Sequence, residues 1–224
     1  MKYLETRKTM CEIGRRIQQN GFVVANDGNI SVKLNEYEYL TSPTGVSKGY
    51  MEPEMIVLVN EKGTAIEDNS YNPSSEIKVH LQVYKNRPDV NSVIHTHPQY
   101  ATIFAILNEP LDMYILPETV FNVGCVPIVP YAQPSSVQLA DNIVPYLDDY
   151  DAFLLENHGL ITIGPDILSA YFKTETVEFF AATVYKLKQI GCSREMTKPQ
   201  IDGILDARRQ SNVVGRHPGY KKLS

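Results

Sequence analysis

The spacing of hydrophobic residues predicts helices and short strands that alternate along the whole chain. Apolar residues at helical spacing predict helices over residues 2–20, from 74 or 75 to 86, 99–107, 135–147 and 165–190, with a short one around 201–210. Short apolar runs bounded by turn residues predict strands over 29–34, 37–41, 55–60, 90–96, 126–130, 152–156 and 160–163. The chain should therefore form a mixed helix and strand structure.

The order of these elements indicates one α/β domain. Helices and strands interleave with no internal repeat or linker, which favours helices packed over a central sheet. Strands joined by tight turns, at Asn35-Glu36 and at Asn157-His158-Gly159, favour antiparallel or mixed pairing. We expect a single domain over residues 1–224, with a polar tail from about residue 195.

Composition excludes several classes of protein. With 43% hydrophobic and 21% charged residues, the chain has the make-up of a soluble globular protein. A net charge of −5 without a Lys/Arg block argues against a nucleic-acid partner. The N-terminus lacks the apolar core of a signal peptide, and no apolar run approaches the ~20 residues of a membrane span. Three scattered cysteines, Cys11, Cys125 and Cys192, suit reduced thiols, so we expect a cytoplasmic protein away from membranes.

Two of the five histidines, His95 and His97, lie one residue apart at the end of a predicted strand. Alternate side chains of a strand share a face, so these two imidazoles should lie about 7 Å apart and could converge on one ion. Hydrogen-bonded structural histidines are the simpler alternative. Two histidines on one apolar strand nevertheless favour a divalent metal.

A third metal ligand must come from elsewhere in the chain. His158 follows an apolar strand in a tight turn, where functional groups concentrate. His80 lies four residues after Glu76 on one face of a predicted helix, so it competes for the role. His217 lies in the polar tail and should be solvated. A third histidine would complete the open three-histidine arrangement of catalytic zinc.

The start of the second predicted helix carries Ser74, Ser75 and Glu76. These residues suit ordinary helix capping, and they also suit an anion site at a helix N-terminus. Glu76 beside a metal could act as a base or an extra ligand. Two Gly/Ser/Thr loops, over residues 26–31 and 42–49, are weak signals of phosphate binding, since most such loops are only turns.

Taken in order, the motifs GNIS, SPTG, SSE, HTHP and NHG resemble the class II aldolase/adducin family. The resemblance runs from the first helix to about Ile190. It implies a three-layer αβα domain with a mixed, largely antiparallel central sheet. It also implies a homotetramer with active sites between subunits, and a Zn²⁺ or another divalent ion as cofactor.

The resemblance assigns roles to individual residues. His95, His97 and His158 match the metal ligands, which decides against His80, and Glu76 matches the acid/base that can also bind metal without substrate. The positions that match the substrate phosphate pocket are Asn29, Thr44, Gly45, Ser74 and Ser75, with Gly28 beside Asn29. Tyr114 is similar in placement to a tyrosine that reaches the neighbouring subunit's site, and Tyr220 in the tail could serve as a lid.

The activity implied by the resemblance is metal-assisted cleavage of a ketose 1-phosphate to dihydroxyacetone phosphate and an aldehyde. Related activities in the same family are pentulose-phosphate 4-epimerisation, dehydration of methylthioribulose phosphate and cleavage of 5-deoxypentulose phosphates. A non-catalytic adducin-like module is the alternative of another class. The presence of all three histidines and Glu76 favours an enzyme.

Overall fold

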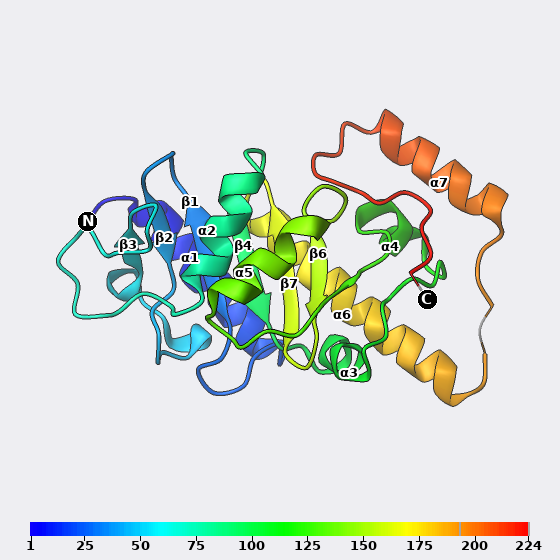
Figure 1. Ribbon diagram of the computed structural model, residues 1–224, viewed down its shortest axis with the longest axis horizontal. Coiled ribbons are helices and arrows are strands. Elements are labelled where there is room, and N and C mark those ends of the chain that lie inside the picture. The colour runs from blue at the N-terminus through cyan, green and yellow to red at the C-terminus, as the bar shows by residue number, and fades with distance from the viewer. Residues whose placement is uncertain (193, 224) are drawn as a thin grey trace.

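The computed structural model describes residues 1–192 and 194–223 (Figure 1). Its α-helices are α1 (Leu4–Gln19), α2 (Ile77–Asn86), α3 (Gln99–Leu107), α4 (Pro117–Asn122), α5 (Val137–Ile143), α6 (Ile167–Gln189) and α7 (Lys198–Gln210). Its strands are β1 (Asn29–Lys33), β2 (Tyr39–Thr41), β3 (Val57–Val59), β4 (Ser92–Thr96), β5 (Ile128–Val129), β6 (Ala152–Leu155) and β7 (Gly159–Gly164). Short 3₁₀ helices are η1 (Lys48–Tyr50), η2 (Pro53–Met55) and η3 (Val144–Tyr146).

The strands form one mixed sheet in the order β3-β2-β1-β4-β7-β6-β5. Neighbouring strands pair antiparallel except β5, which runs parallel to β6. The short connections in the β1–β2 and β6–β7 pairs explain this pattern, because a tight turn can join only antiparallel neighbours. The expected mixed, largely antiparallel sheet is confirmed.

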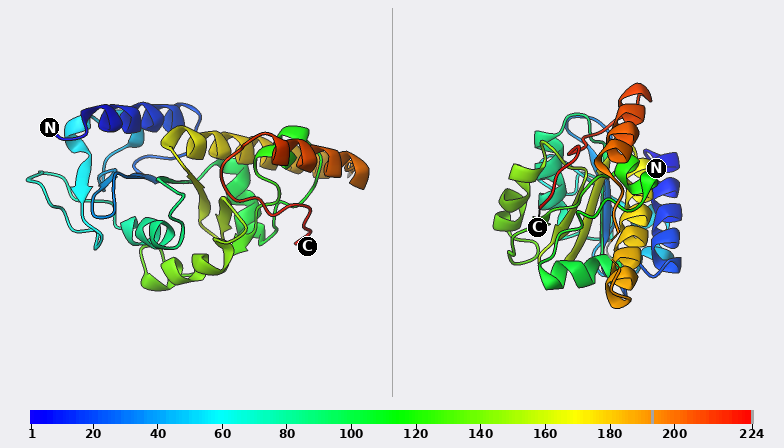
Figure 2. Two further views of the ribbon diagram at one scale, coloured as in Figure 1. Left: turned by 90° about the horizontal axis from the view of Figure 1, so that it is seen from above. Right: turned by 90° about the vertical axis from the view of Figure 1, so that its right-hand side faces the viewer.

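Helices cover both faces of the sheet, with α1 and α6 on one side and α2 and α5 on the other (Figure 2). Side chains of β4 alternate between these faces. Val93 packs with residues of α2 and α5, whereas Ile94 packs with residues of α1. His95 therefore shares the α2 face with Val93. The three-layer αβα architecture is confirmed, and its α2 face holds the residues of chemical interest.

Several boundaries differ from those that the sequence predicts. Helix α4 was not predicted, because it has only six residues and starts with Pro117, so it has little periodicity to detect. The helix expected over 135–147 divides into α5 and η3, whose Pro145 lacks the backbone donor that would continue α5. Helix α6 begins at Ile167 rather than at Pro165, because the Asp166 side chain caps it by accepting from the Ser169 amide.

The C-terminal segment folds back onto α4 instead of extending as a solvated tail. His217 was expected in solvent, but Nε2 donates to the Val120 carbonyl at 2.6 Å and Nδ1 accepts from the Gly219 amide at 3.0 Å. Burial, assisted by the nearby Arg208 charge, lowers the pKa of His217 to about 4. An uncharged His217 thus joins the segment to α4, which corrects the sequence expectation.

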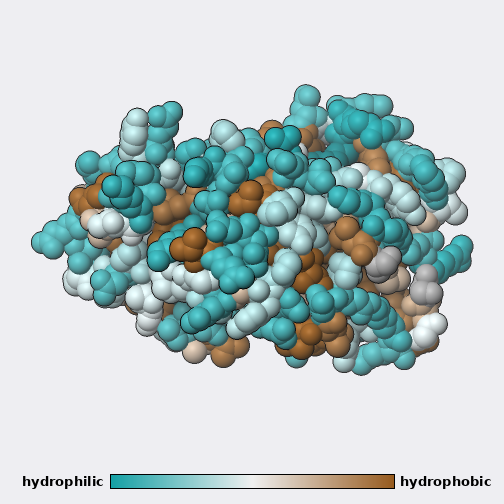
Figure 3. All heavy atoms as spheres, viewed as in Figure 1, coloured by the Kyte–Doolittle hydropathy of each residue, from teal (hydrophilic) through white to brown (hydrophobic). Residues whose placement is uncertain are grey.

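No helix in the described part of the chain is long and apolar enough to cross a membrane. The face shown in Figure 3 is mainly hydrophilic, with hydrophobic residues in small separate groups. Other exposed hydrophobic side chains lie on α6, at Leu168, Phe172 and Phe179.

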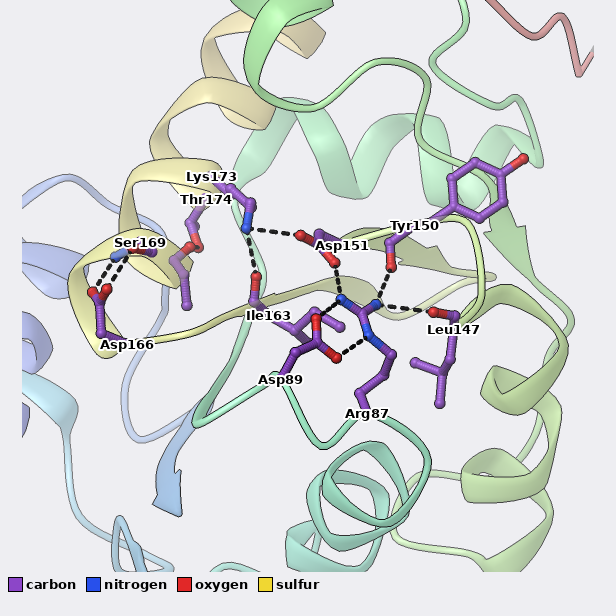
Figure 4. Close-up of polar contacts among 11 residues, drawn as sticks. Arg87, Asp89, Leu147, Tyr150, Asp151, Ile163, Asp166, Ser169, Lys173 and Thr174 are labelled. Carbon is purple, nitrogen blue, oxygen red and sulfur yellow. Dashed lines mark hydrogen bonds and ion pairs between the residues drawn. The ribbon is translucent and has the colours of Figure 1, made fainter. Parts of the chain in front are cut away.

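A buried ion network fixes the strand ends opposite the histidines (Figure 4). Asp151, which precedes β6, accepts from Arg87 at 2.8 Å and from Lys173 of α6 at 3.0 Å. Arg87 also pairs with Asp89 and donates to the backbone carbonyls of Leu147 and Tyr150, which follow η3. The network ties the start of β6 to α6 and to the loop before β4.

Replacing Asp151 by asparagine is expected to lower the free energy of unfolding by about 3–5 kcal/mol, because it leaves two buried cations without their shared carboxylate. Urea denaturation measures this difference. Asp89→Asn is the matched control. Asp89 is 37% exposed, so its loss should cost less than about 1 kcal/mol. An equal decrease in the free energy of unfolding in both variants would show that burial does not set the contribution of these carboxylates.

Candidate active site

Three histidines from separate segments meet at one end of the sheet. His95 lies in β4, His97 follows that strand, and His158 lies in the turn between β6 and β7. Strands β4 and β7 pair antiparallel, with Thr96 opposite Leu160, so the turn that carries His158 lies beside the end of β4. One ring nitrogen of each histidine lies within 4.8 Å of the corresponding nitrogens of the other two.

The imidazoles face inward through their Nε2 atoms. Nε2 of His95 lies 3.0 Å from Nε2 of His97 and 3.3 Å from Nε2 of His158. Nδ1 of His95 donates to the Leu160 carbonyl at 3.0 Å, which leaves the Nε2 lone pair directed into the cluster. Histidines that bind metals usually donate their other ring N–H to a carbonyl or carboxylate in this way, which fixes their tautomer.

This arrangement fits a divalent cation. Burial and the neighbouring imidazoles hold the pKa of His95 well below its ordinary value. Burial also lowers the pKa of His158, although Glu76 opposes the shift. Neutral imidazoles with converging lone pairs are the donors that zinc prefers, and three of them leave coordination positions open for a substrate.

Two glycines allow the close approach of backbone segments at this cluster. A Cβ on Gly28, whose φ is +73°, would lie 2.8 Å from the His95 carbonyl oxygen. A Cβ on Gly159 would lie 2.5 Å from the Thr96 carbonyl oxygen and 2.6 Å from Cδ2 of His97. Any side chain at either position would push the loop away from the histidines.

Glu76 lies directly over the histidine cluster. It is the residue before α2, and its Oε2 lies 3.4 Å from Nε2 of His95 while Oε1 lies 3.8 Å from Nε2 of His158. Asn29, the register partner of His95, donates to Oε2 at 2.7 Å and holds the carboxylate in place. From this position Glu76 can bind the cation or exchange a proton with a ligand on it.

A cavity of about 220 Å³ opens beside the cluster. It is lined by all six residues that the sequence predicted for phosphate binding, Gly28, Asn29, Thr44, Gly45, Ser74 and Ser75. Glu76, His97 and His158 also line it. The structure therefore brings the two weak loop signals and the helix start together at a single site.

Sequence reasoning missed further residues that line this cavity, among them Asp27, Lys48 and Ser135. Asp27 places Oδ2 3.6 Å from Nδ1 of His97, and Ser135 donates to Ser75 at 2.9 Å. Lys48 also lines it. Asp27 and Lys48 belong to the loops singled out by their composition, whereas nothing in the sequence around Ser135 relates it to the site.

His80 lies outside the cluster. Its Nδ1 bonds with the Ser31 hydroxyl at 2.7 Å, and that hydroxyl lies 2.7 Å from the Tyr84 hydroxyl. Burial lowers the pKa of His80 to about 3. His80 is thus a neutral, buried residue between α2 and β1.

Tyr114 lies beneath the C-terminal segment of its own chain. Its side chain is 1% exposed, and its hydroxyl accepts from the Lys221 amide at 2.6 Å and donates to the Lys221 carbonyl at 2.8 Å. Tyr220 packs against it with ring centroids 4.8 Å apart. With residues 219–221 in this position the hydroxyl bonds within its own chain, and a role for Tyr114 at a neighbouring subunit's site stays a prediction.

Known proteins with similar sequences and structures carry related names. Residues 8–185 match the family described as "Class II Aldolase and Adducin N-terminal domain". An L-fuculose phosphate aldolase of Methanococcus maripaludis is 34% identical over 179 residues, covering 80% of this chain and 96% of that protein. A 3-oxo-tetronate 4-phosphate decarboxylase of Haemophilus influenzae is 31% identical over 193 residues, covering 84% and 90%. A solved L-fuculose 1-phosphate aldolase matches with a TM-score of 0.83 at 25% identity, covering 93% and 98%.

Proposed function

Because the chain belongs to the class II aldolase and adducin family, we propose that it is a metal-dependent aldolase acting on a ketose 1-phosphate. The substrate is L-fuculose 1-phosphate or a related deoxy-sugar phosphate, and the products are dihydroxyacetone phosphate and an aldehyde. One observation carries this proposal. Three imidazoles converge beneath the Glu76 carboxylate, at a cavity lined with hydroxyls and amides.

His95, His97 and His158 would hold the cation, with Glu76 as a further ligand when substrate is absent. A zinc ion or another divalent cation bound there would polarise the ketose carbonyl and offset the negative charge that develops as the carbon–carbon bond breaks. Imidazoles bind a cation in their uncharged form, so they would leave the charge of the cation largely uncompensated. The proposed chemistry needs that charge.

Glu76 is the proposed proton carrier. When the C3–C4 bond breaks, its electron pair stays with the fragment that contains C3, and a proton must then reach C3. The Glu76 carboxylate lies within 3.8 Å of two histidine Nε2 atoms and is oriented by Asn29. Tyr114 of a neighbouring subunit would take the proton of the C4 hydroxyl once residues 219–221 release its hydroxyl.

The phosphate would lie in the part of the cavity formed by the loop at Thr44 and Gly45 and by the start of α2. Hydroxyls of Ser74 and Ser75 line the same space. Donors at a helix start bind anions readily, and holding the phosphate fixes the distance from C3 to Glu76.

We also propose that the chain forms a homotetramer. The exposed Leu168, Phe172 and Phe179 lie on one side of α6, where a second copy of the chain could cover them. Light scattering during size-exclusion chromatography should report four chains per particle.

A second candidate is decarboxylation of a phosphorylated 3-oxo sugar acid, which the similarity to the Haemophilus influenzae decarboxylase favours. Decarboxylation also leaves an electron pair on a carbon next to a carbonyl, so the same cation and the same proton carrier would serve. The two reactions differ in the fragment released, which makes them separable by product analysis.

The test is incubation of the zinc-loaded protein with a panel of sugar phosphates. Fuculose, rhamnulose, ribulose and 5-deoxyribulose 1-phosphates are assayed for dihydroxyacetone phosphate, 3-oxo-tetronate 4-phosphate for carbon dioxide, and ribulose 5-phosphate for epimerisation. Release of dihydroxyacetone phosphate from a ketose 1-phosphate supports the aldolase. Carbon dioxide alone would establish the second candidate, and xylulose 5-phosphate alone an epimerase.

A further inference from the structure

A buried lysine, Lys48, lines the same cavity as the histidine cluster and has no role in the proposal so far. It begins η1 and is only 1% exposed. Its ammonium donates to the Asn26 carbonyl at 3.1 Å and to the Val46 carbonyl at 2.6 Å. Lys48 therefore joins the two loops that border the cavity.

The charge of Lys48 has no direct counterion in the described part of the chain. Both of its acceptors are uncharged carbonyls, and no carboxylate there forms an ion pair with it. The Asp27 carboxylate interacts with Lys48 only electrostatically, without a hydrogen bond or an ion pair. It lies beside His97 and its side chain is 50% exposed. Burying an ammonium costs free energy that two neutral hydrogen bonds offset only in part. A methionine or leucine would fill the position without this cost.

Burial lowers the pKa of Lys48 to about 8. At neutral pH the side chain is therefore still mainly protonated. The cavity thus has a buried positive charge among its lining residues, and Asp27, which also lies against His97, is the carboxylate that acts on this charge.

The residues that are proposed to hold the phosphate are neutral. Ser74, Ser75 and Thr44 offer hydroxyls, and the loop offers backbone amides. Neutral donors orient a phosphate, but they distinguish poorly between a phosphate ester and the hydroxyl of an unphosphorylated sugar. A buried cation favours the phosphate ester strongly over the hydroxyl, because a hydrogen bond between charged groups is about twice as strong as a neutral one.

We propose that Lys48 provides the positive charge by which this cavity selects a phosphorylated ligand over its unphosphorylated analogue. The inference rests on the proposed function, because it takes the cavity as the place of the substrate phosphate. Lys48 is a specificity residue and takes no part in bond cleavage, so its effect is measured by binding, independently of turnover.

The experiment compares binding of glycerol phosphate and glycerol by isothermal titration calorimetry, with the metal content of each protein matched. Lys48→Gln keeps a donor for the two carbonyls but removes the charge, and Lys48→Arg keeps the charge. Lys62→Gln is the matched control at an exposed lysine. Lys48→Gln should raise the Kd for glycerol phosphate about 10- to 100-fold. Lys48→Arg should keep most of the affinity, and Lys62→Gln should change nothing.

Unchanged affinity for glycerol phosphate in a folded Lys48→Gln protein would overturn the inference. Equal losses in the glutamine and arginine variants would also overturn it, because Lys48 would then act only as a tie between loops. If the sugar-phosphate panel shows no turnover while glycerol phosphate binding still depends on Lys48, the proposed reaction fails and the inference about Lys48 stands.

Discussion

Replacing Glu76 by glutamine is expected to lower kcat about 100- to 10,000-fold, the usual contribution of a positioned acid or base. Glutamine has the same shape, and its Oε1 can still accept from Asn29, so the side chain should stay over the histidines. It cannot carry a proton to or from C3. Steady-state kinetics on the active ketose 1-phosphate measure the loss.

Metal content, measured by mass spectrometry, should remain near one ion per chain in Glu76→Gln, because the three histidines are unchanged. Glu61→Gln, at an exposed position, is the control and should leave kcat unchanged. Full activity in the Glu76 variant would remove this residue from the mechanism. Loss of both metal and activity would show that Glu76 is mainly a ligand.

Replacing His158 by asparagine is expected to weaken metal binding more than about 100-fold. Even residues that only hydrogen-bond to a metal ligand contribute about 10- to 100-fold to metal affinity. Its Nε2 lies 3.3 Å from that of His95, and the asparagine amide is too short to replace it. Activity should fall in proportion to bound metal at micromolar zinc. Competition with a fluorescent zinc chelator measures the affinity.

His80→Asn is the matched control for this prediction. His80 bonds to Ser31 between α2 and β1 and lies outside the cluster, so its replacement should retain one metal per chain even if thermal stability falls. Retention of metal in the His158 variant, or its loss in the folded His80 variant, would show that the wrong histidine has been assigned.

Much of the fold could be predicted from local patterns. The two-residue period of β4 placed His95 and His97 on one side of a strand, and the tight turn before Gly159 indicated an antiparallel β6–β7 pair. Turn chemistry and apolar runs are local properties, so the sequence reports them directly. Their order also predicted helices packed over a central sheet, while the three-layer arrangement was implied by the family resemblance.

Long-range contacts could not be read in the same way. From the residues alone, His80 and His158 were both candidates for the third ligand, and the pairing of β4 with β7 brings only the second to the cluster. Lys48 lies in one of the two Gly/Ser/Thr loops that suggested phosphate binding. Its burial, however, depends on a contact with Asn26, which belongs to the other loop. The burial of Tyr114 could not be predicted, because the return of the tail over it depends on residues 217–223, whose sequence has no periodic pattern.

The central claim is that three imidazoles hold a divalent cation on which sugar cleavage depends. The most direct measurement is activity on a ketose 1-phosphate, recorded with the bound metal per chain, before chelation, after it and after zinc is restored. The account predicts that cleavage disappears as the metal is removed and returns when about one zinc per chain is bound. Undiminished cleavage by the metal-free protein would contradict it.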